Sequence, residues 1–498
     1  MAADLIKNFI FQRLLERGTD VEAAYQLALE GLRDRILEKE VLVSGGFAIR
    51  ASSIFLNHWL IARTGEEVVA REVFDRFKRY ADDDAGLPMA KLVEQVHRAA
   101  EVYRQFIPDP SSLTGSIDRL GLFVYRTGVL ESEVIKPMVL YLLDLEQPAI
   151  PEAQFVKALD VVESWMVRRM LVRATTKSYS QIVAELVAVL RRSDRARAGD
   201  VVESFFANQS SGSRYWPDDA EIREELAGLL AYRRLGRGRL RMVLEAIEDH
   251  RRGWKDGKAG LGAERVARGN LAIEHVMPRK WHSYWPLDGH EEAERDRGIH
   301  TLGNLTLLTK KLNSKQSNGP WLGAGGKREG LEQHDVLILN RELLKRAGDK
   351  WTDDAIHTRT RDLIEIIVEV WPVPVGHKSG FSPESKPRLR KKVQLADLIN
   401  GGVLAPGMTL FPARKKYSDR VATLLPDGYV DVDGVAYASP SDAASAIAGK
   451  RTGGWWFFLT DQANRTSLRK IRRDYVNAMV VDAEDDEPDE DDDDERDQ

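Results

Sequence analysis

Residues 271–285, "LAIEHVMPRKWHSYW", decide how the middle of this 498-residue chain is interpreted. The stretch begins as an apolar, strand-like run and ends in an acid–histidine pair, Glu274-His275. Pro, Arg, Lys, two Trp and another His follow this pair. One interpretation is a strand edge with a polar tip, or a histidine that is satisfied within the core. The other is a nuclease active site, and the residues around the stretch have to decide between them.

The residues after the stretch repeat the same kind of pattern. A second strand-like run, "TLGNLTLL" at 301–308, carries Asn304, and the polar, helix-capable "KLNSKQSN" that follows carries Asn313. Four of the ten histidines also fall between positions 275 and 300. A β-hairpin followed by a helix can bring such side chains to one divalent metal ion. The order of residues therefore favours a catalytic site over an isolated buried histidine.

Phosphodiester hydrolysis needs a base for the attacking water and a Lewis acid for the developing charge. We expect His275 to be the base. Glu274 and Asn313 offer hard oxygen ligands of the kind that Mg²⁺ and Mn²⁺ prefer, with His300 or Asn318 as the next candidates. Asn304 would hold the loop or orient His275.

Composition restricts the class of protein. The length suits about three domains, and no window approaches the roughly 18 uninterrupted apolar residues of a membrane span. The start, "MAADLIKNF", lacks the layout of a signal peptide. There are no cysteines, which excludes disulfides and cysteine-ligated zinc sites. We therefore expect a cytoplasmic protein without membrane segments.

The charge is divided unevenly along the chain. Residues 481–498 hold 13 acids and one Arg, a charge of −12; removing it from the total of −5 leaves +7 for residues 1–480. A run of like charges this dense repels itself, so we expect residues 478–498 to be a disordered acidic tail. The tail either aids solubility or competes with DNA for the basic surface of the chain.

Residues 1–250 are predicted to be all-α, because apolar residues recur at helical spacing, as in "DLIKNFIFQRLLERG" at 4–18. Two segments are strongly basic, "RRSDRARAGD" at 191–200 and "YRRLGRGRLRM" at 232–242. Either could contact phosphate, although a solvated helix face is the favoured role. The segment "GAGGKREG" at 323–330 lacks the spacing and the Ser or Thr of a phosphate-binding loop, and is rejected as one.

The rest of the chain suggests a second compact part. Residues 251–371 would form the nuclease domain, closed by helices that end at Trp371, and the basic, aperiodic residues 372–392 read as a linker. Residues 393–477 combine the helix "LADLINGG", the alternating "YVDVDGVAYASP", the helix "SDAASAIAG" and the aromatic run "GGWWFFL", which we interpret as a strand. This predicts a small α/β domain.

The middle of the chain resembles the HNH, or His-Me finger (ββα-metal), nucleases. It is similar to the nuclease half of the GmrSD-type modification-dependent restriction enzymes, in which "EHVMP", "HTLGNLTLL" and an Asn-x-x-x-x-Asn stretch occur in that order. The resemblance extends over about residues 1–372. It implies a prokaryotic antiviral restriction system and cleavage of modified double-stranded DNA.

One motif of that family is missing. An NTP-binding domain with an Asp-Gly-Gln-Gln-Arg-like motif normally precedes the helices with which this sequence begins, and no such motif occurs here. Either the sequence starts after that domain or the domain is a separate protein. In the second case an NTP-binding partner subunit is expected.

Residues 393–477 resemble the RAMA domain, the restriction-enzyme-and-adenine-methylase-associated module proposed to sense modified DNA. Aromatic rings could stack on a base and hydroxyls could serve a phosphate or a base edge. The DNA-contact candidates are Tyr437, Ser439, Ser441, Trp455 and Trp456. We expect at least one of the two Trp to be core. Two other functions stay open: a catalytically silent reader of DNA modification, and an RNA-directed nuclease toxin.

Overall fold

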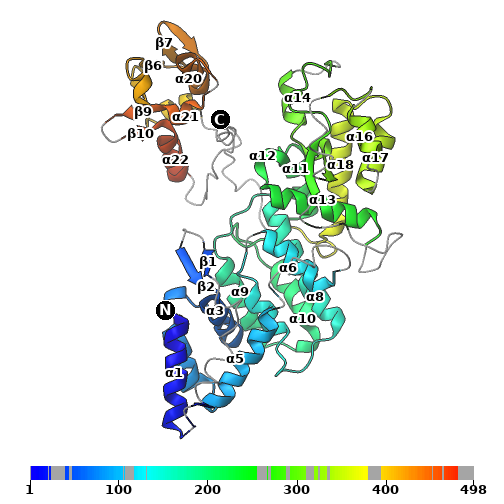
Figure 1. Ribbon diagram of the computed structural model, residues 1–498, viewed down its shortest axis with the longest axis vertical. Coiled ribbons are helices and arrows are strands. Elements are labelled where there is room, and N and C mark those ends of the chain that lie inside the picture. The colour runs from blue at the N-terminus through cyan, green and yellow to red at the C-terminus, as the bar shows by residue number, and fades with distance from the viewer. Residues whose placement is uncertain are drawn as a thin grey trace. The chain divides into compact units, whose positions relative to one another are not determined.

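The computed structural model describes most of the chain, with gaps. The described residues are 2–18, 20, 22–23, 40–43, 47–104, 106, 117–130, 132–254, 266, 268, 271–287, 292–309, 319–323, 326–333, 337–379, 394–450, 452–462 and 465–479. The chain divides into two compact units, residues 1–381 and residues 382–498. Each unit is described by itself. Figure 1 shows that the first unit is mainly helical and that the second combines a sheet with short helices.

The N-terminal half of the first unit is built from helices, as predicted. They are α1 (Ala2–Glu16), α3 (Ala51–Thr64), α4 (Val73–Arg79), α5 (Met89–Arg104), α6 (Arg119–Val129), α7 (Lys136–Leu142), α8 (Glu152–Leu171), α9 (Tyr179–Arg191) and α10 (Ala198–Ala207). Their apolar faces share one core. In α1, for example, Ile6, Ile10 and Leu14 recur at every fourth position and are buried, which is the stripe that a helix packed on one side requires.

The prediction that residues 1–250 are all-α is wrong at one place. Strands β1 (Glu40–Val43) and β2 (Phe47–Arg50) form an antiparallel hairpin, with Val41 opposite Ile49. The local sequence explains it: "EVLVSGGFAIR" places β-branched residues on both sides of a Ser-Gly-Gly segment, and a glycine-containing connection between such runs favours a hairpin.

A second core joins helices from both sides of residue 250. Helices α11 (Asp219–Ala227), α12 (Ala231–Arg234) and α13 (Arg237–Arg251) pack with β3 (Leu271–His275), β4 (Leu305–Thr309) and α18 (Asp353–Val370). Helices α14 (Glu292–Gly298), α16 (Lys327–Gln333) and α17 (Ile338–Ala347) complete the region. The predicted helical closure up to Trp371 is present as α17 and α18. The boundary proposed at residue 250 does not appear as a break in this packing.

The expected hairpin of the nuclease core is present. β3 and β4 pair antiparallel with His275 opposite Leu305, and the one-turn 3₁₀ helix η5 (Leu302–Asn304) leads into β4. The helix that would complete a ββα unit falls on residues 310–318, which lie outside the described residues. The ββα arrangement therefore stays a prediction.

The first residues of the predicted linker are hydrogen-bonded to other residues of the first unit. The Pro372 carbonyl accepts a hydrogen bond from the Ser164 hydroxyl at 2.7 Å. His377 Nε2 lies 3.0 Å from the Trp216 carbonyl oxygen, and the amide of Ser379 donates to Asp218 at 3.1 Å. Residues 372–379 are thus part of the first unit, because their backbone polar groups find partners on it.

The second unit is a small α/β domain, as predicted. Its six strands pair antiparallel in the order β10-β9-β5-β6-β7-β8. They are β5 (Thr409–Pro412), β6 (Ala422–Leu424), β7 (Val430–Val432), β8 (Val435–Tyr437), β9 (Phe458–Asp461) and β10 (Thr466–Ser467). The helices are α19 (Leu395–Asn400), α20 (Pro440–Ala448), α21 (Gly454–Phe457) and α22 (Leu468–Met479). The core contains residues of both strands and helices.

Two expectations for this unit need correction. The run "GGWWFFL" is not one strand: Trp455 and Trp456 lie on the single turn α21, and β9 begins only at Phe458. Gly454 lies so close to the start of α20 that a Cβ there would meet the backbone of Pro440 and Ser441, a contact that holds this turn in place. The acidic tail was expected from residue 478, but α22 continues to Met479; residues 480–498 lie outside the described residues.

Candidate active site

The end of strand β3 positions the acid–histidine pair. Successive side chains of a strand point to opposite faces, so Glu274 and His275 leave the hairpin in different directions. Leu305 and Leu307 of β4 are buried in the second core and fix the register of the hairpin. The amide of Val276 donates to the Asn304 carbonyl at 2.9 Å, which extends the pairing past the strand end. His275 is buried there, with 7% of its surface exposed.

Asn304 is completely buried and holds the turn that follows His275. Its Oδ1 accepts hydrogen bonds from the Met277 amide at 2.8 Å and from the Trp351 indole at 3.0 Å. Its Nδ2 donates to the carbonyls of Met277 and Ile299, at 2.8 and 2.9 Å. All four hydrogen bonds go to this turn and its packing partners, so the side chain has the geometry of a loop support.

The His275 ring lies against two aromatic side chains from other segments. Its Nε2 is 3.4 Å from Nδ1 of His300, and the Tyr232 ring on α12 packs edge-on with its centroid 4.1 Å away. Burial, followed by the charges of His300, Arg279 and Lys327, holds the pKa of His275 well below its usual range. His275 is therefore a neutral imidazole at neutral pH, with a lone pair on one ring nitrogen.

Cationic side chains surround the histidine pair. Burial lowers the pKa of His300 to about 4, with further contributions from Arg233 and Arg279. Arg237 stacks on the Tyr232 ring, with its Cζ 3.4 Å from the centroid, and donates to the Tyr232 carbonyl. Positive charge gathered in this way attracts phosphate groups. The basic segment 232–242, for which a solvated helix face was the favoured role, thus supplies part of the site.

Glu274 contacts a lysine that the sequence did not indicate. Lys327, the first residue of α16, donates from Nζ to the Glu274 carboxylate and, at 2.9 Å, to the His275 carbonyl. Burial raises the pKa of the Glu274 carboxyl, and Lys327 opposes that shift. Lys327 comes from the segment 323–330 that had been rejected as a phosphate loop. The structure gives it a different role, because its ammonium group offsets the charge of a half-buried carboxylate.

The metal ligands can be placed only in part. Within the described ranges, no group of three or more His, Asp and Glu side chains converges to hold a metal ion. Asn313 and the alternative ligand Asn318 lie in 310–318, outside those ranges. Mg²⁺ keeps several waters and needs only one or two carboxylates from the protein. Glu274 is the carboxylate that could meet this requirement; Lys327 pairs with its Oε1, so Oε2 is the oxygen that would remain for a metal.

The five DNA-contact candidates of the second unit differ in accessibility. Ser439 caps α20, with its Oγ 3.1 Å from the Asp442 amide and 2.6 Å from the Asp442 carboxylate. Ser441 Oγ accepts from the Gly454 amide at 3.2 Å. Both hydroxyls are thus engaged in the fold. Tyr437, at the end of β8, is half-buried against the core.

The two tryptophans behave differently from each other. Trp455 is half-buried against the core, with the Arg472 guanidinium 4.3 Å from its ring centroid. Trp456 is 54% exposed, and Arg469 lies 4.0 Å from its ring centroid. The expectation that at least one Trp is core is met only in part, because Trp455 packs against the core but is half-buried. Trp456 with Arg469 is therefore the aromatic surface that a base could reach.

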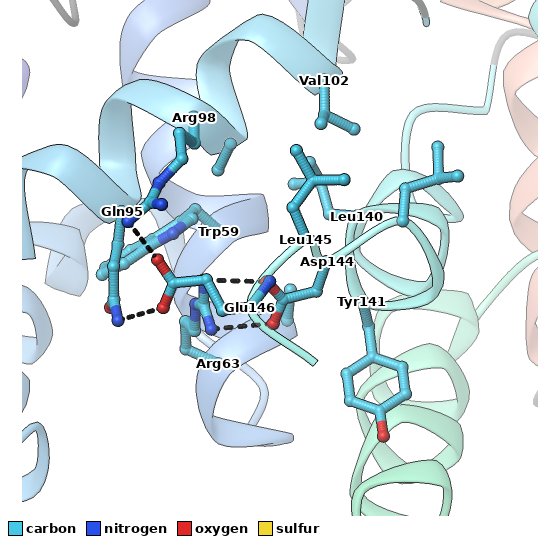
Figure 2. A pocket seen from close by; sticks show the side chains of 13 residues that line it. Trp59, Arg63, Gln95, Arg98, Val102, Leu140, Tyr141, Asp144, Leu145 and Glu146 are labelled. Carbon is cyan, nitrogen blue, oxygen red and sulfur yellow. Dashed lines mark hydrogen bonds and ion pairs between the residues drawn. The ribbon is translucent and has the colours of Figure 1, made fainter. Parts of the chain in front are cut away.

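A separate small cavity lies among the N-terminal helices (Figure 2). Ion pairs border it, Arg63 with Asp144 at 2.8 Å and Arg98 with Glu146 at 2.6 Å. Its volume of about 20 Å³ has room for little more than one water molecule. None of its lining residues belongs to the cluster around His275, so it does not extend that site.

Two family models match the chain. Residues 216–366 match the C-terminal domain of the GmrSD restriction endonucleases, and residues 377–480 match the Restriction Enzyme Adenine Methylase Associated (RAMA) domain. The order of the two matches is the one expected from the resemblance. A search of curated proteins found no match. In the part of the chain that the structure describes, no helix is both long and apolar enough to cross a bilayer. The two matches together indicate a restriction endonuclease.

Proposed function

Because residues 216–366 belong to the GmrSD restriction-endonuclease C-terminal domain and residues 377–480 to the RAMA domain, we propose that the chain is a metal-dependent DNA endonuclease subunit of a prokaryotic antiviral restriction system. One observation carries this proposal. Within the first matched region, a buried, neutral histidine ends a strand beside a carboxylate, with the cationic side chains of Arg237, Arg279 and Lys327 near it. Arg233 adds a fourth positive charge near the neighbouring His300.

His275 acts as the general base. Its Nδ1 has no hydrogen-bond partner among the described residues and is left to meet a water molecule. The surrounding cations draw a phosphate towards the imidazole. Arg233 and Arg279 are exposed and can contact the phosphate backbone of a duplex. Asn304 and Lys327 do not contact the DNA; they hold the turn after His275 and the end of its strand in place.

Glu274 and Asn313 would hold the divalent metal, Mg²⁺ or Mn²⁺. Bound there, the metal would supply a Lewis acid for the charge that develops on the phosphate. The Lys327 ammonium pairs with Glu274 Oε1, so the metal would be held by Oε2.

The second unit selects the DNA. Trp456, supported by Arg469, offers a ring for stacking, whereas Tyr437, Trp455, Ser439 and Ser441 shape the surface around it. The substrate is modified double-stranded DNA. The chain acts in the cytoplasm, where such DNA enters.

Plasmid cleavage tests the proposal. Modified and unmodified plasmids are incubated with the wild type and with His275→Ala, in Mg²⁺ and in EDTA. We expect Mg²⁺-dependent cleavage that falls by about 10²–10⁴-fold in the variant, the usual cost of losing a general base. DNA binding should persist, because Arg233 and Arg279 remain.

Three outcomes oppose the proposal. Cleavage by His275→Ala at the wild-type rate removes the histidine from catalysis. Binding of modified DNA without cleavage by the wild type favours the catalytically silent reader. Cleavage of RNA in preference to DNA favours the nuclease toxin.

A further inference from the structure

Three elements that are distant in sequence meet at the His275 ring. His275 ends β3, His300 lies in the turn between α14 and η5, and Tyr232 lies on α12. The two imidazole rings are nearly perpendicular, at 86°, with centroids 5.4 Å apart. The closest approach joins His275 Nε2 to His300 Nδ1, at 3.4 Å. One nitrogen of the proposed base is thus directed at a second histidine.

His300 is held from two sides. Its carbonyl accepts a hydrogen bond from the Tyr232 amide, and its own amide donates to the Arg297 carbonyl, both at 3.1 Å. Its ring lies nearly parallel to the Tyr232 ring, at an interplanar angle of 23°. With 3% of its surface exposed, His300 has little freedom to turn away. A side chain held in this way can fix the position of its neighbour.

The hydrogen bond between the two neutral imidazole rings can be formed in two ways, which differ in which ring donates its N–H. A neutral imidazole carries one N–H, so one ring donates and the other accepts. If His300 Nδ1–H donates, His275 accepts at Nε2 and bears its own proton on Nδ1, which then has no lone pair for water. If His275 Nε2–H donates, its Nδ1 lone pair stays free. Only the second arrangement leaves His275 able to act as a base.

We propose that His300 is a positioning residue that accepts the hydrogen bond of His275 Nε2–H and thereby fixes the tautomer in which Nδ1 takes a proton. The inference rests on the proposed function, in which His275 is the base. As water attacks, its O–H bond breaks and the proton moves to His275 Nδ1. The water oxygen bonds to phosphorus, the P–O ester bond breaks, and the leaving oxygen takes a proton from solvent. His275 becomes an imidazolium whose Nε2–H still donates to His300, which stays neutral.

Two substitutions of His300 separate this role from packing. His300→Leu fills the space without an acceptor, whereas His300→Asn places an amide oxygen near the position of Nδ1. We expect His300→Leu to lower kcat by at least about tenfold, as the loss of a supporting hydrogen bond does at other sites. KM and the affinity for DNA should stay within twofold. His300→Asn should restore most of the loss.

The matched control is His97→Leu, which removes an exposed histidine of α5 that contacts Glu101 at 3.6 Å. It should cleave like the wild type. His300→Leu at full kcat overturns the inference. So does His300→Asn as inactive as His300→Leu with both variants folded, because packing rather than the acceptor would then matter.

A measurement without catalysis tests the tautomer itself. In the full chain labelled with ¹⁵N-histidine, the signals of His275 are assigned from their loss in His275→Ala. We expect the wild type to carry the His275 proton on Nε2 and His300→Leu to show a mixture of tautomers. A His275 proton on Nδ1 in the wild type overturns the inference whether or not the chain cleaves DNA. The expected tautomer in a chain that cleaves nothing supports the pairing and refutes the proposed function alone.

Discussion

Asn304 and His275 are both buried polar side chains at one turn, but their hydrogen bonding differs. All the polar atoms of the Asn304 amide have partners, whereas His275 keeps one nitrogen without a partner among the described residues. A side chain whose hydrogen bonds are all used within the fold contributes to stability, and one with an unused acceptor is available for chemistry. The two residues should therefore respond differently to truncation.

We predict that Asn304→Ala destabilises the first unit by about 2 kcal/mol or more, since a stranded buried polar group costs about 1–3 kcal/mol. The amide of Met277, the Trp351 indole and the Ile299 carbonyl would all lose a partner. Urea unfolding followed by tryptophan fluorescence measures the change, with His275→Ala as the matched variant that should lose far less. Equal losses in the two variants would contradict the distinction.

The residues that the sequence could indicate are those joined by local order. Glu274 and His275 are adjacent, and Asn304 follows in a recognisable run, so their common location could be predicted. The positions of Lys327 and Tyr232 could not be predicted. Each lies more than forty residues from the strand end that it contacts, and the sequence does not indicate which helix will pack there. The sequence indicates His300 as one of four clustered histidines and as an alternative ligand, but its pairing with His275 depends on the fold.

Among the elements, η5 and α18 lie in unusually close contact. A Cβ on Gly303 would meet the carbonyl oxygen of Ile356 and the side chain and amide of Thr360. The Gly303 amide donates to Thr360 Oγ1 at 3.0 Å, and Arg359 donates to the Gly303 and Leu305 carbonyls at 2.6 and 2.8 Å. This contact sets the position of Asn304, and through it the turn after His275.

We predict that Gly303→Ala destabilises the chain by about 1–3 kcal/mol, the usual cost of overpacking. It should also lower kcat, because η5 moves away from α18 and carries Asn304 with it. The matched control is Gly298→Ala at the end of α14, where an added Cβ meets nothing within 4 Å. Thermal unfolding and plasmid cleavage are measured on both variants. Normal stability of Gly303→Ala would show that the contact can relax.

Element types followed from periodicity where packing agreed with it. The stripe of α1 and the closing helix α18 were predictable, and so was the β7–β8 hairpin, where Asp433 and Gly434 take the positive φ values of a tight turn. The run "WWFF" was not, because four consecutive aromatics suit a buried strand and a helical turn equally well. The close approach of Gly454 to α20 decided between them, and that approach joins residues 13 positions apart.

At the scale of the whole molecule, the proposed function assigns cleavage to the first of the two compact units and recognition to the second. The first unit contains His275, Glu274 and the cations around them, and the second has its own core and its own six-stranded sheet. No acid–His–Asn set occurs in the sequence of residues 393–477. Under the proposed function the second unit binds the DNA, and the exposed Trp456 and the basic side chains of α22 are the proposed contacts.

We predict that a chain ending at residue 381 still cleaves DNA but loses most of its preference for modified DNA. The isolated residues 382–498 should bind DNA with marked salt dependence, because their first contacts are with phosphates. A modified base adds a local contact worth about 1–3 kcal/mol, so the preference should be roughly tenfold to a hundredfold. Affinities are measured on matched modified and unmodified duplexes at two salt concentrations.

Two variants of the isolated unit then locate the reading surface. Trp456→Ala should weaken binding by a similar 1–3 kcal/mol, about the worth of one stacked base. Tyr429→Ala removes another exposed aromatic, one without a stacked arginine in the described structure, and should leave binding unchanged. If both variants bind alike and the truncated nuclease keeps its full selectivity, modified DNA is read by the helical first unit or by a partner subunit. The close approach of Arg469 to Trp456 would then serve only the fold of α22.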